Sequence, residues 1–154
     1  MRTEAALLIL MASASPALAG PAEDATAVVT TVLNKFNAGD FNAFAAAHHD
    51  GAIIVDEFAP FLWGGSGSLQ KWGKDYEKDA AARGITAGKI DYGKPLAATS
   101  DGTSAYIVLP TTYRFQQKGR KMAGKGSMTF VMRGVGKAWK IASWTYSGAE
   151  PVPE

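Results

Sequence analysis

The spacing of apolar residues changes once along this chain, near Gly84, and this change limits the folds that the chain can adopt. Before Gly84, apolar residues recur at intervals of three and four, which is the period of a helix that buries one face. After Gly84, short apolar stretches alternate with polar residues and are separated by turn residues, which is typical of antiparallel strands. Helices followed by strands predict an α+β domain.

Three helices and one strand are expected before Gly84. Asp24 and Asp40 are N-cap candidates for the first two helices, and Ser66 or Ser68 for the third. Gly84 suits the position that follows the third helix. The expected ranges are 25–36, 41–48 and up to residue 83 for the helices, 52–55 for the strand, and 60–68 for a glycine-rich loop.

Four strand regions are expected after Gly84, and together they predict a curled sheet with the helices on its concave side. Pro110 indicates a sheet edge or a bulge, because proline cannot donate a backbone hydrogen bond. Residues 149–154 are expected to form a flexible tail. The expected strand ranges are 85–98, 105–117, 126–133 and 138–147.

Composition excludes several classes of protein. The chain has 154 residues, enough for one domain, and its 16 basic and 14 acidic residues give a net charge of only +2. Such a balance does not predict a nucleic-acid partner. Cysteine is absent and the only two histidines are adjacent, so no disulfide or thiol nucleophile exists and no metal or other cofactor is expected.

The first nineteen residues have the layout of a secretory signal peptide. One arginine precedes a short apolar stretch, and Ala17-Leu18-Ala19 forms a cleavage site. The stretch is shorter than the roughly 20 residues that span a bilayer, so no membrane span is expected. Cleavage after Ala19 would send residues 20–154 to the periplasm or the medium. The alternative is a buried N-terminal helix.

Four motifs in this order resemble the nuclear transport factor two-like superfamily, and its SnoaL-like and steroid delta-isomerase-like branches in particular. The resemblance spans residues 25–148. It implies a cone-shaped, curved antiparallel (mixed) sheet with three N-terminal helices that enclose a pocket, often in a dimer. The motifs are Phe-Asn-Ala-Gly-Asp at 36–40, the acidic pair at 56–57, the stretch from Gly65 to Trp72, and Gly-Lys-Ala-Trp-Lys-Ile at 136–141 followed by Ser147.

The resemblance places Asp56 at the position of a general base. A carboxylate in an apolar pocket has a raised pKa and can exchange protons near neutral pH. Val32 and Met128 stand where the isomerases carry two oxyanion donors, which argues against the same chemistry. Asp56 either contacts a ligand or terminates a strand through hydrogen bonds, whereas Glu57 is expected on the opposite, solvated face. His48 is either a hydrogen-bonded core histidine or a partner for Asp56.

A pocket or a filled core could use the same inward-facing side chains. Most of the candidates are aromatic or aliphatic, as in sites for small molecules. Trp63 is expected on the loop at the pocket mouth, and Trp72 and Tyr76 on the apolar face of the third helix. The ligand-binding candidates are Trp63, Trp72, Tyr76, Tyr113, Phe115, Met128, Phe130, Ile141, Ser143 and Thr145.

Strand alternation also predicts an apolar outer sheet face. Tyr106, Val131, Trp144 and Tyr146 would point outward, where an exposed sheet is normally polar. Such a surface predicts a homodimer.

Three functions follow from these observations. The first is the binding of a small apolar or aromatic molecule in the pocket. The second is an enzyme that uses Asp56 as general acid or base, of the isomerase, dehydratase, cyclase or epoxide-hydrolase type. The third is a structural homodimer with a filled core. A cavity of about 300 Å³ or more would distinguish the first two from the third.

Overall fold

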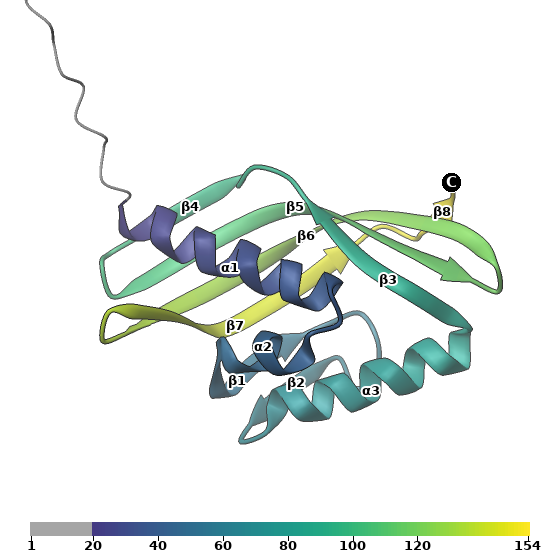
Figure 1. Cartoon of the computed structure of the whole chain (residues 1–154), viewed down its shortest axis with the longest axis horizontal. Coiled ribbons are helices and arrows are strands. Elements are labelled where there is room, and N and C mark those ends of the chain that lie inside the picture. The colour runs from purple at the N-terminus through teal and green to yellow at the C-terminus, as the bar shows by residue number, and fades with distance from the viewer. Residues whose placement is uncertain (1–19) are drawn as a thin grey trace, which may run out of the picture.

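A computed structural model describes residues 20–154, and the expected signal peptide lies outside them. Three helices precede most of the strands, which confirms the α+β class (Figure 1). No helix among the described residues is both long and apolar enough to cross a bilayer. The elements are α1 (Pro21–Asn37), α2 (Phe41–Ala46), β1 (His48–Val55), β2 (Leu62–Gly65), α3 (Ser68–Arg83), β3 (Ile85–Tyr92), β4 (Ala97–Ser100), β5 (Ser104–Gln117), β6 (Arg120–Val135), β7 (Ala138–Gly148) and β8 (Val152–Pro153).

All the strands belong to one mixed sheet. Its main order is β2-β1-β7-β6-β5-β3, with β4 paired to β5 and β8 paired to β6. Only β1 and β7 pair in parallel, and the other pairs are antiparallel. Figure 1 shows α1 lying across the long strands and α3 running below it, and buried residues of all three helices belong to one cluster with the inward side chains of the sheet.

The helices bury their apolar faces against the inner face of the sheet. Val29, Val32 and Leu33 of α1 are almost wholly inaccessible to solvent. They belong to one cluster with the inward side chains of the central strands, so burial of apolar area stabilises this arrangement. As expected, alternate residues of β5 and β6 supply that inner face, including Ile107, Leu109, Met128, Phe130 and Met132.

The ends of the helices differ from the sequence expectation. α1 begins at Pro21 rather than residue 25, because proline is tolerated in the first helical turn, and Gly20 is its N-cap instead of Asp24. α2 does have the expected N-cap, Asp40, whose carboxylate accepts a hydrogen bond from the Ala43 N–H. It ends at Ala46, before residue 48, because the Ala47 carbonyl accepts the Ile141 N–H and the chain enters β1.

The loop expected at 60–68 contains a strand. Residues 62–65 form β2, which pairs with β1 and places Trp63 opposite Ile54. Gly67, not Ser66 or Ser68, precedes α3, while Gly84 has the expected left-handed conformation at its end, with φ 68°. The expected strand at 85–98 is divided into β3 and β4.

On the side of β5 that faces β3 and β4, Pro110 lies where neither strand pairs with it. Tyr92, at the end of β3, pairs with Thr111, and Ala97, at the start of β4, pairs with Val108. Pro110 falls between these pairs, and its carbonyl accepts the Gly93 N–H. The interruption therefore removes the need for a hydrogen bond that proline cannot donate, which confirms the predicted edge.

A bulge at Ala142 reverses the faces of the second half of β7. Met132 pairs with Ile141 and Val131 pairs with Ser143, so one residue of β7 has no partner in β6. Ile141, before the bulge, faces inward as expected. Beyond the bulge Trp144 is buried, whereas Ser143 and Thr145, which were expected to face inward, are not. Side chains along a strand alternate between its two faces, so one inserted residue moves every later side chain to the other face. The faces expected for these later residues are therefore wrong.

The chain end is paired rather than free. Residues 149–154, expected to form a flexible tail, include β8, where Val152 pairs with Ala123 of β6. The Ala149 N–H and the Glu154 N–H donate to carbonyls of β6, and the Glu154 carboxylate forms an ion pair with Arg114. This segment therefore closes one end of the sheet's inner face.

Candidate functional site

A cavity of about 550 Å³ lies between α3, the inner face of the sheet and the chain end. Its volume is within the range of small-molecule sites and exceeds the 300 Å³ or so that separates a pocket from a filled core. Its wall is mostly aromatic and aliphatic, with charged groups from several segments. The aromatic members of the wall are Phe36, Phe44, Phe58, Phe61, Trp72, Tyr76, Tyr113, Phe115, Trp144 and Tyr146.

Asp56 lies directly after β1 and brings a carboxylate to this wall. One oxygen accepts a hydrogen bond from the Trp72 indole N–H at 2.9 Å, and the other accepts the Glu57 backbone N–H at 2.8 Å. Burial raises the pKa of Asp56 to about 6, although these two hydrogen bonds favour the charged form and counteract part of the increase. Asp56 can therefore gain or lose a proton near neutral pH.

Trp72 is the centre of the aromatic wall. Its ring stacks on Tyr76, with ring centroids 5.3 Å apart, and meets Trp144 edge-on at 5.2 Å. Trp72 is 4% exposed, so packing fixes the indole that donates to Asp56. The aromatic groups thus hold the carboxylate in one orientation.

Two phenols form a hydrogen-bonded pair in the wall. The Tyr76 and Tyr113 hydroxyl oxygens are 2.8 Å apart. Burial is the main cause that raises the pKa of each, so both remain protonated at neutral pH. Gly88 makes room for the pair, because a Cβ atom at that position would lie 2.6 Å and 2.7 Å from the two hydroxyl oxygens. One proton of the pair is free to donate to a ligand oxygen.

Charged side chains gather where loop 56–61, α3 and the chain end meet. Glu57 is exposed as expected, but it lines the same cavity as Asp56 instead of lying on the opposite face, and its carboxylate accepts the Gly148 N–H. Asp79 and Arg83 pair at 3.2 Å on α3, and Glu150 completes the set of charged lining residues. These groups connect the apolar interior to water.

Six of the predicted site residues share this cavity. Asp56, Trp72, Tyr76 and Tyr113 supply its polar groups and aromatic faces, and Phe115 and Met128 supply apolar surface. Phe130 and Ile141 are buried in the core and do not line the cavity.

Three other candidates lie elsewhere. Trp63 is 4% exposed rather than solvent-facing, and its indole N–H donates to the carboxylate of Asp75 in α3. Ser143 and Thr145 lie on the outer face because of the bulge at Ala142. None of the three lines the cavity.

His48 is also separate from Asp56. It begins β1 rather than ending a helix, and its Nδ1 lies 2.9 Å from the Phe44 carbonyl, to which it donates. Burial lowers the pKa of His48 to about 4, so the ring is neutral at neutral pH. It lines a smaller hollow of about 160 Å³ with His49 and Asp50, not the large cavity.

Sequence reasoning missed six of the ten aromatic members of the wall, namely Phe36, Phe44, Phe58, Phe61, Trp144 and Tyr146. Trp144 and Tyr146 were assigned to the outer face, but they line the cavity. Burial raises the pKa of Tyr146 to about 12, with further contributions from the charges of Glu57 and Asp56. No local signal indicates the bulge that turns these residues inward, since Ala142 is an ordinary strand residue.

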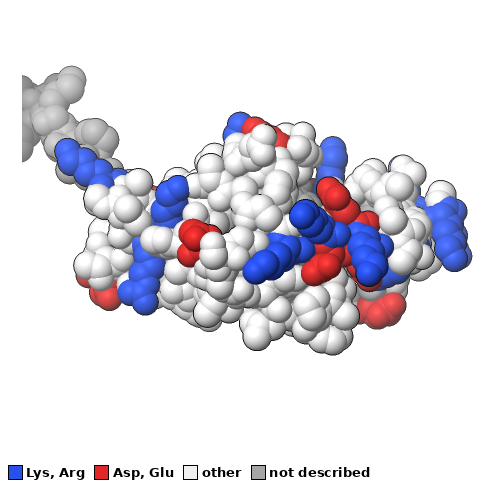
Figure 2. Space-filling model, turned by 90° about the horizontal axis from the view of Figure 1, so that it is seen from below, with Lys and Arg blue, Asp and Glu red and all other residues white. Residues whose placement is uncertain are grey.

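Within residues 20–154, no three His, Cys, Asp or Glu side chains come together in a way that could hold a metal ion. The chemical groups that the site offers are a carboxylate that titrates near neutrality, neutral phenols and aromatic faces. On the face seen from below in Figure 2, basic and acidic side chains are interspersed, so this face carries no single-sign patch of the kind that binds nucleic acid.

Comparisons with known proteins agree with this architecture. The family described as SnoaL-like domain matches residues 25–151. Among curated proteins, no sequence matches the chain significantly. A ketosteroid isomerase-like protein from Erwinia carotovora atroseptica has a similar structure, with a TM-score of 0.65, 17% identity, and coverage of 83% of this chain and 95% of its own.

Two further solved structures have the same fold. One is the hexachlorocyclohexane dehydrochlorinase LinA-type3 from Novosphingobium barchaimii, with a TM-score of 0.69, 8% identity, and coverage of 85% and 88% of the two chains. The other is the CaMKII hub of S. rosetta, with a TM-score of 0.69, 20% identity, and coverage of 86% and 99%. At these identities the likeness concerns the fold, and it confirms the cone-shaped architecture.

Proposed function

The chain belongs to the SnoaL-like domain family, and we propose that it binds a small apolar or aromatic molecule in the cavity beside α3. The observation that carries this proposal is the open volume of about 550 Å³ behind a mainly aromatic wall. A purely structural domain gains nothing from such a space, because unfilled volume in a core reduces stability.

A fluorescent apolar probe tests this proposal. N-phenyl-1-naphthylamine, which is neutral at pH 7.5, should bind the purified protein with an increase in emission. Ala80→Trp should abolish the increase, because Ala80 lines the cavity and an indole there would fill it. The matched control is Ala82→Trp, which adds the same ring at an exposed position of α3 outside the cavity. Equal emission from the wild type and Ala80→Trp would contradict the proposal.

A second candidate function is proton transfer by Asp56, and the pKa of about 6 favours it. A general base is most effective when its pKa is near the working pH. Asp56 would take a proton from the carbon beside a substrate carbonyl, and the phenol pair would donate a hydrogen bond to the resulting enolate oxygen. In a substrate with a double bond β,γ to the carbonyl, protonation at the γ-carbon by the same carboxyl group would move the double bond into conjugation and complete an isomerisation. Two structural neighbours are named as a ketosteroid isomerase-like protein and a dehydrochlorinase.

Hydrogen–deuterium exchange on a bound ketone tests this second function. In D₂O, the protein should accelerate loss of the α-protons of 1-tetralone, followed by NMR. Asp56→Asn should reduce the acceleration by roughly a hundredfold or more, which is the usual contribution of a general base. The rate should rise with pH through about 6, since only the ionised carboxyl group accepts a proton. Exchange no faster than in buffer would leave binding as the function.

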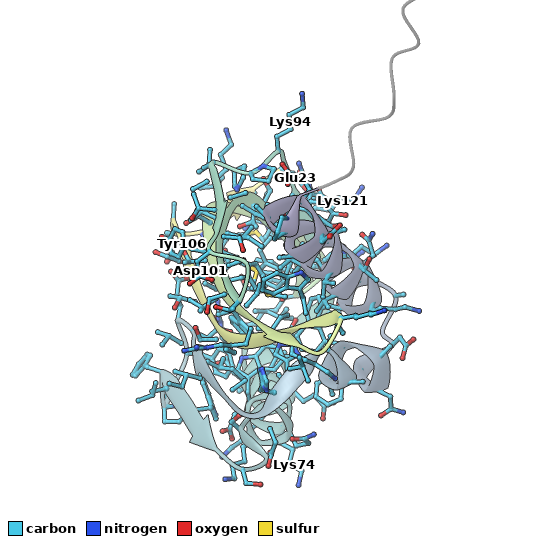
Figure 3. All side chains as sticks on the ribbon, turned by 90° about the vertical axis from the view of Figure 1, so that its left-hand side faces the viewer. Glu23, Lys74, Lys94, Asp101, Tyr106 and Lys121 are labelled. Atoms are coloured by element: carbon cyan, nitrogen blue, oxygen red, sulfur yellow. The ribbon has the colours of Figure 1, made fainter. Side chains whose placement is uncertain are left out.

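We also propose the cell location and the assembly. Residues 1–19 have the pattern of a signal peptide, which supports export and cleavage after Ala19. The outer sheet face supports a homodimer, although its composition differs from the expectation. Trp144 and Tyr146 lie inside, so Tyr106 and Val131 remain, accompanied by small uncharged residues such as Thr129, Ser143 and Thr145. Figure 3 shows Tyr106 on the side of the sheet away from α1.

A further inference from the structure

We propose that the ligand of this cavity is an organic cation, an aromatic molecule with a protonated amine that lies against Asp56. The inference rests on the proposed binding function and names the chemical class of its ligand. It depends on the balance of charge in the wall and on the aromatic faces around the carboxylate.

The first observation is a partly buried carboxylate that has no cationic partner among the described residues. Within residues 20–154, no lysine or arginine forms an ion pair with Asp56. Its two hydrogen bonds come from a neutral indole and a neutral backbone amide. Removing a charge from water costs free energy unless an opposite charge compensates, so the site is incomplete as it stands.

The second observation is the sign of the surrounding charges. Glu57, Asp79 and Glu150 line the same cavity as Asp56, and among residues 20–154 Arg83 is the only basic side chain of the wall. Arg83 already pairs with Asp79 at 3.2 Å. The charges of Glu57 and Asp79 oppose ionisation of Asp56, which indicates that the potential at the carboxylate is negative. Such a cavity attracts a cation and repels a carboxylate ligand.

The third observation is the kind of surface that faces this charge. Trp72 donates to Asp56, and the charge of Asp56 also contributes to the raised pKa values of Tyr76, Tyr113 and Tyr146, so all these rings lie within electrostatic range of it. Aromatic faces attract a cation, and most strongly where water is excluded. The more distant rings, such as Phe36 and Phe58, offer an apolar surface for the rest of the molecule.

These observations distinguish a cation from a neutral ligand of the same shape. A neutral aromatic molecule would use the apolar wall but would leave Asp56 uncompensated. An ammonium group would form a charge-assisted hydrogen bond with the carboxylate and would contact the rings. The cavity therefore selects a ligand by its positive charge at Asp56 and by apolar contact with the rest of the wall.

Three probes of matched shape test the proposal by isothermal titration calorimetry at pH 7.5. They are 2-(2-naphthyl)ethylamine, which is a cation, 2-(2-naphthyl)ethanol, which is neutral, and 3-(2-naphthyl)propionate, which is an anion. The amine should bind about tenfold or more tightly than the alcohol, in line with a desolvated cation–aromatic contact and an opposite charge. The propionate should bind more weakly than either.

Two variants assign the preference to Asp56. Asp56→Asn should bring the affinities for the amine and the alcohol to within about twofold, because it removes the charge and keeps the shape. Glu77→Gln removes one negative charge from an exposed position of α3 outside the cavity, and it should keep the tenfold preference. Loss of the preference in Glu77→Gln would assign the effect to net charge and would overturn the proposal.

The outcomes separate this proposal from the function on which it rests. Equal affinity of the wild type for the amine and the alcohol would overturn the cationic ligand but would support an apolar binding site. Binding of none of the three probes, together with no response to the neutral fluorescent probe, would overturn both. A tenfold preference that Asp56→Asn removes would support both.

Discussion

Asp56 shows how one residue depends on its surroundings. The same carboxyl group on the protein surface would be ionised at pH 5, whereas burial beside Trp72 raises its pKa to about 6. The indole N–H lowers the pKa again in part, so the two neighbouring influences have opposite signs. Burial is the main cause of the raised pKa, and the charges of Glu57 and Asp79 add to it, so this carboxyl group titrates close to neutrality.

Asp56→Asn should change the pH dependence of stability. The raised pKa means that the folded state binds the Asp56 proton more tightly than the unfolded chain does. The contribution of protonated Asp56 to the free energy of unfolding is fully present below about pH 4 and is lost as the pH rises through about 6. Relative to the wild type, the variant should therefore gain roughly 2–3 kcal/mol in unfolding free energy between pH 4 and pH 7.5. Urea denaturation at the two pH values measures this difference, and a constant difference would contradict the raised pKa.

Trp72→Phe should raise the pKa of Asp56 further. The substitution keeps an aromatic ring but removes the indole N–H that favours the ionised carboxyl group. Carbon-13 NMR titration of the aspartate carboxyl groups measures the shift directly. Tyr92→Phe is a control that removes a hydroxyl hydrogen bond, to Asn34, far from this carboxyl group. An unchanged or lower Asp56 pKa in Trp72→Phe would show that the hydrogen bond does not favour the charged form.

At the scale of elements, the chain end completes the cavity. Ala149, Glu150 and Pro151 line it, and β8 holds them in place by pairing with β6. The Gly148 N–H is bound by Glu57, so the chain end is also attached to the loop that follows β1. The last residues of the sequence therefore act as part of the wall, and their removal should expose the cavity.

The variant that lacks residues 149–154 should release a bound probe several-fold faster than the full chain does. The deletion removes part of the wall while the long strands and all three helices remain. Stopped-flow dilution of the complex with N-phenyl-1-naphthylamine measures the rate. Glu154→Gln is the control, since it removes only the ion pair with Arg114, and exposed ion pairs contribute little. An unchanged release rate after the deletion would show that ligands leave by another path.

At the scale of the whole molecule, the two faces of the sheet have different roles. The inner face carries large apolar side chains and borders the cavity, whereas the outer face combines Tyr106 and Val131 with uncharged Thr and Ser residues. The uncharged central part of this face suits contact with a second copy of the chain, while Lys125 and Arg133 lie toward its two ends.

A protein of residues 20–154 should elute as a dimer in size-exclusion chromatography with light scattering. Val131→Lys should shift it to the mass of a monomer, because a charge at the centre of the outer face would be buried without a partner. Ala82→Lys adds the same charge on the exposed side of α3 and should leave the dimer intact. A monomeric wild type would exclude this assembly.

The sequence by itself determined the three helices, the long strands, and which face of β5 and β6 is buried, but not the short strands β2 and β8. Those properties depend on the spacing of apolar residues within one segment, so a local pattern is enough to predict them. The motifs at 36–40 and 136–141 also led to the correct family, and Asp56 and Trp72 to the correct cavity.

Only the tertiary structure decided where Trp63, Trp144 and Tyr146 lie and how the chain ends. Trp63 is buried because β2 pairs with β1, and Trp144 and Tyr146 turn inward because β7 has one more residue than β6 can pair. Residues 149–154 are held by a strand that lies far away in the sequence. Pairing between distant strands sets register and bulges, and a bulge of one residue reverses every side chain beyond it, so no local pattern contains this information.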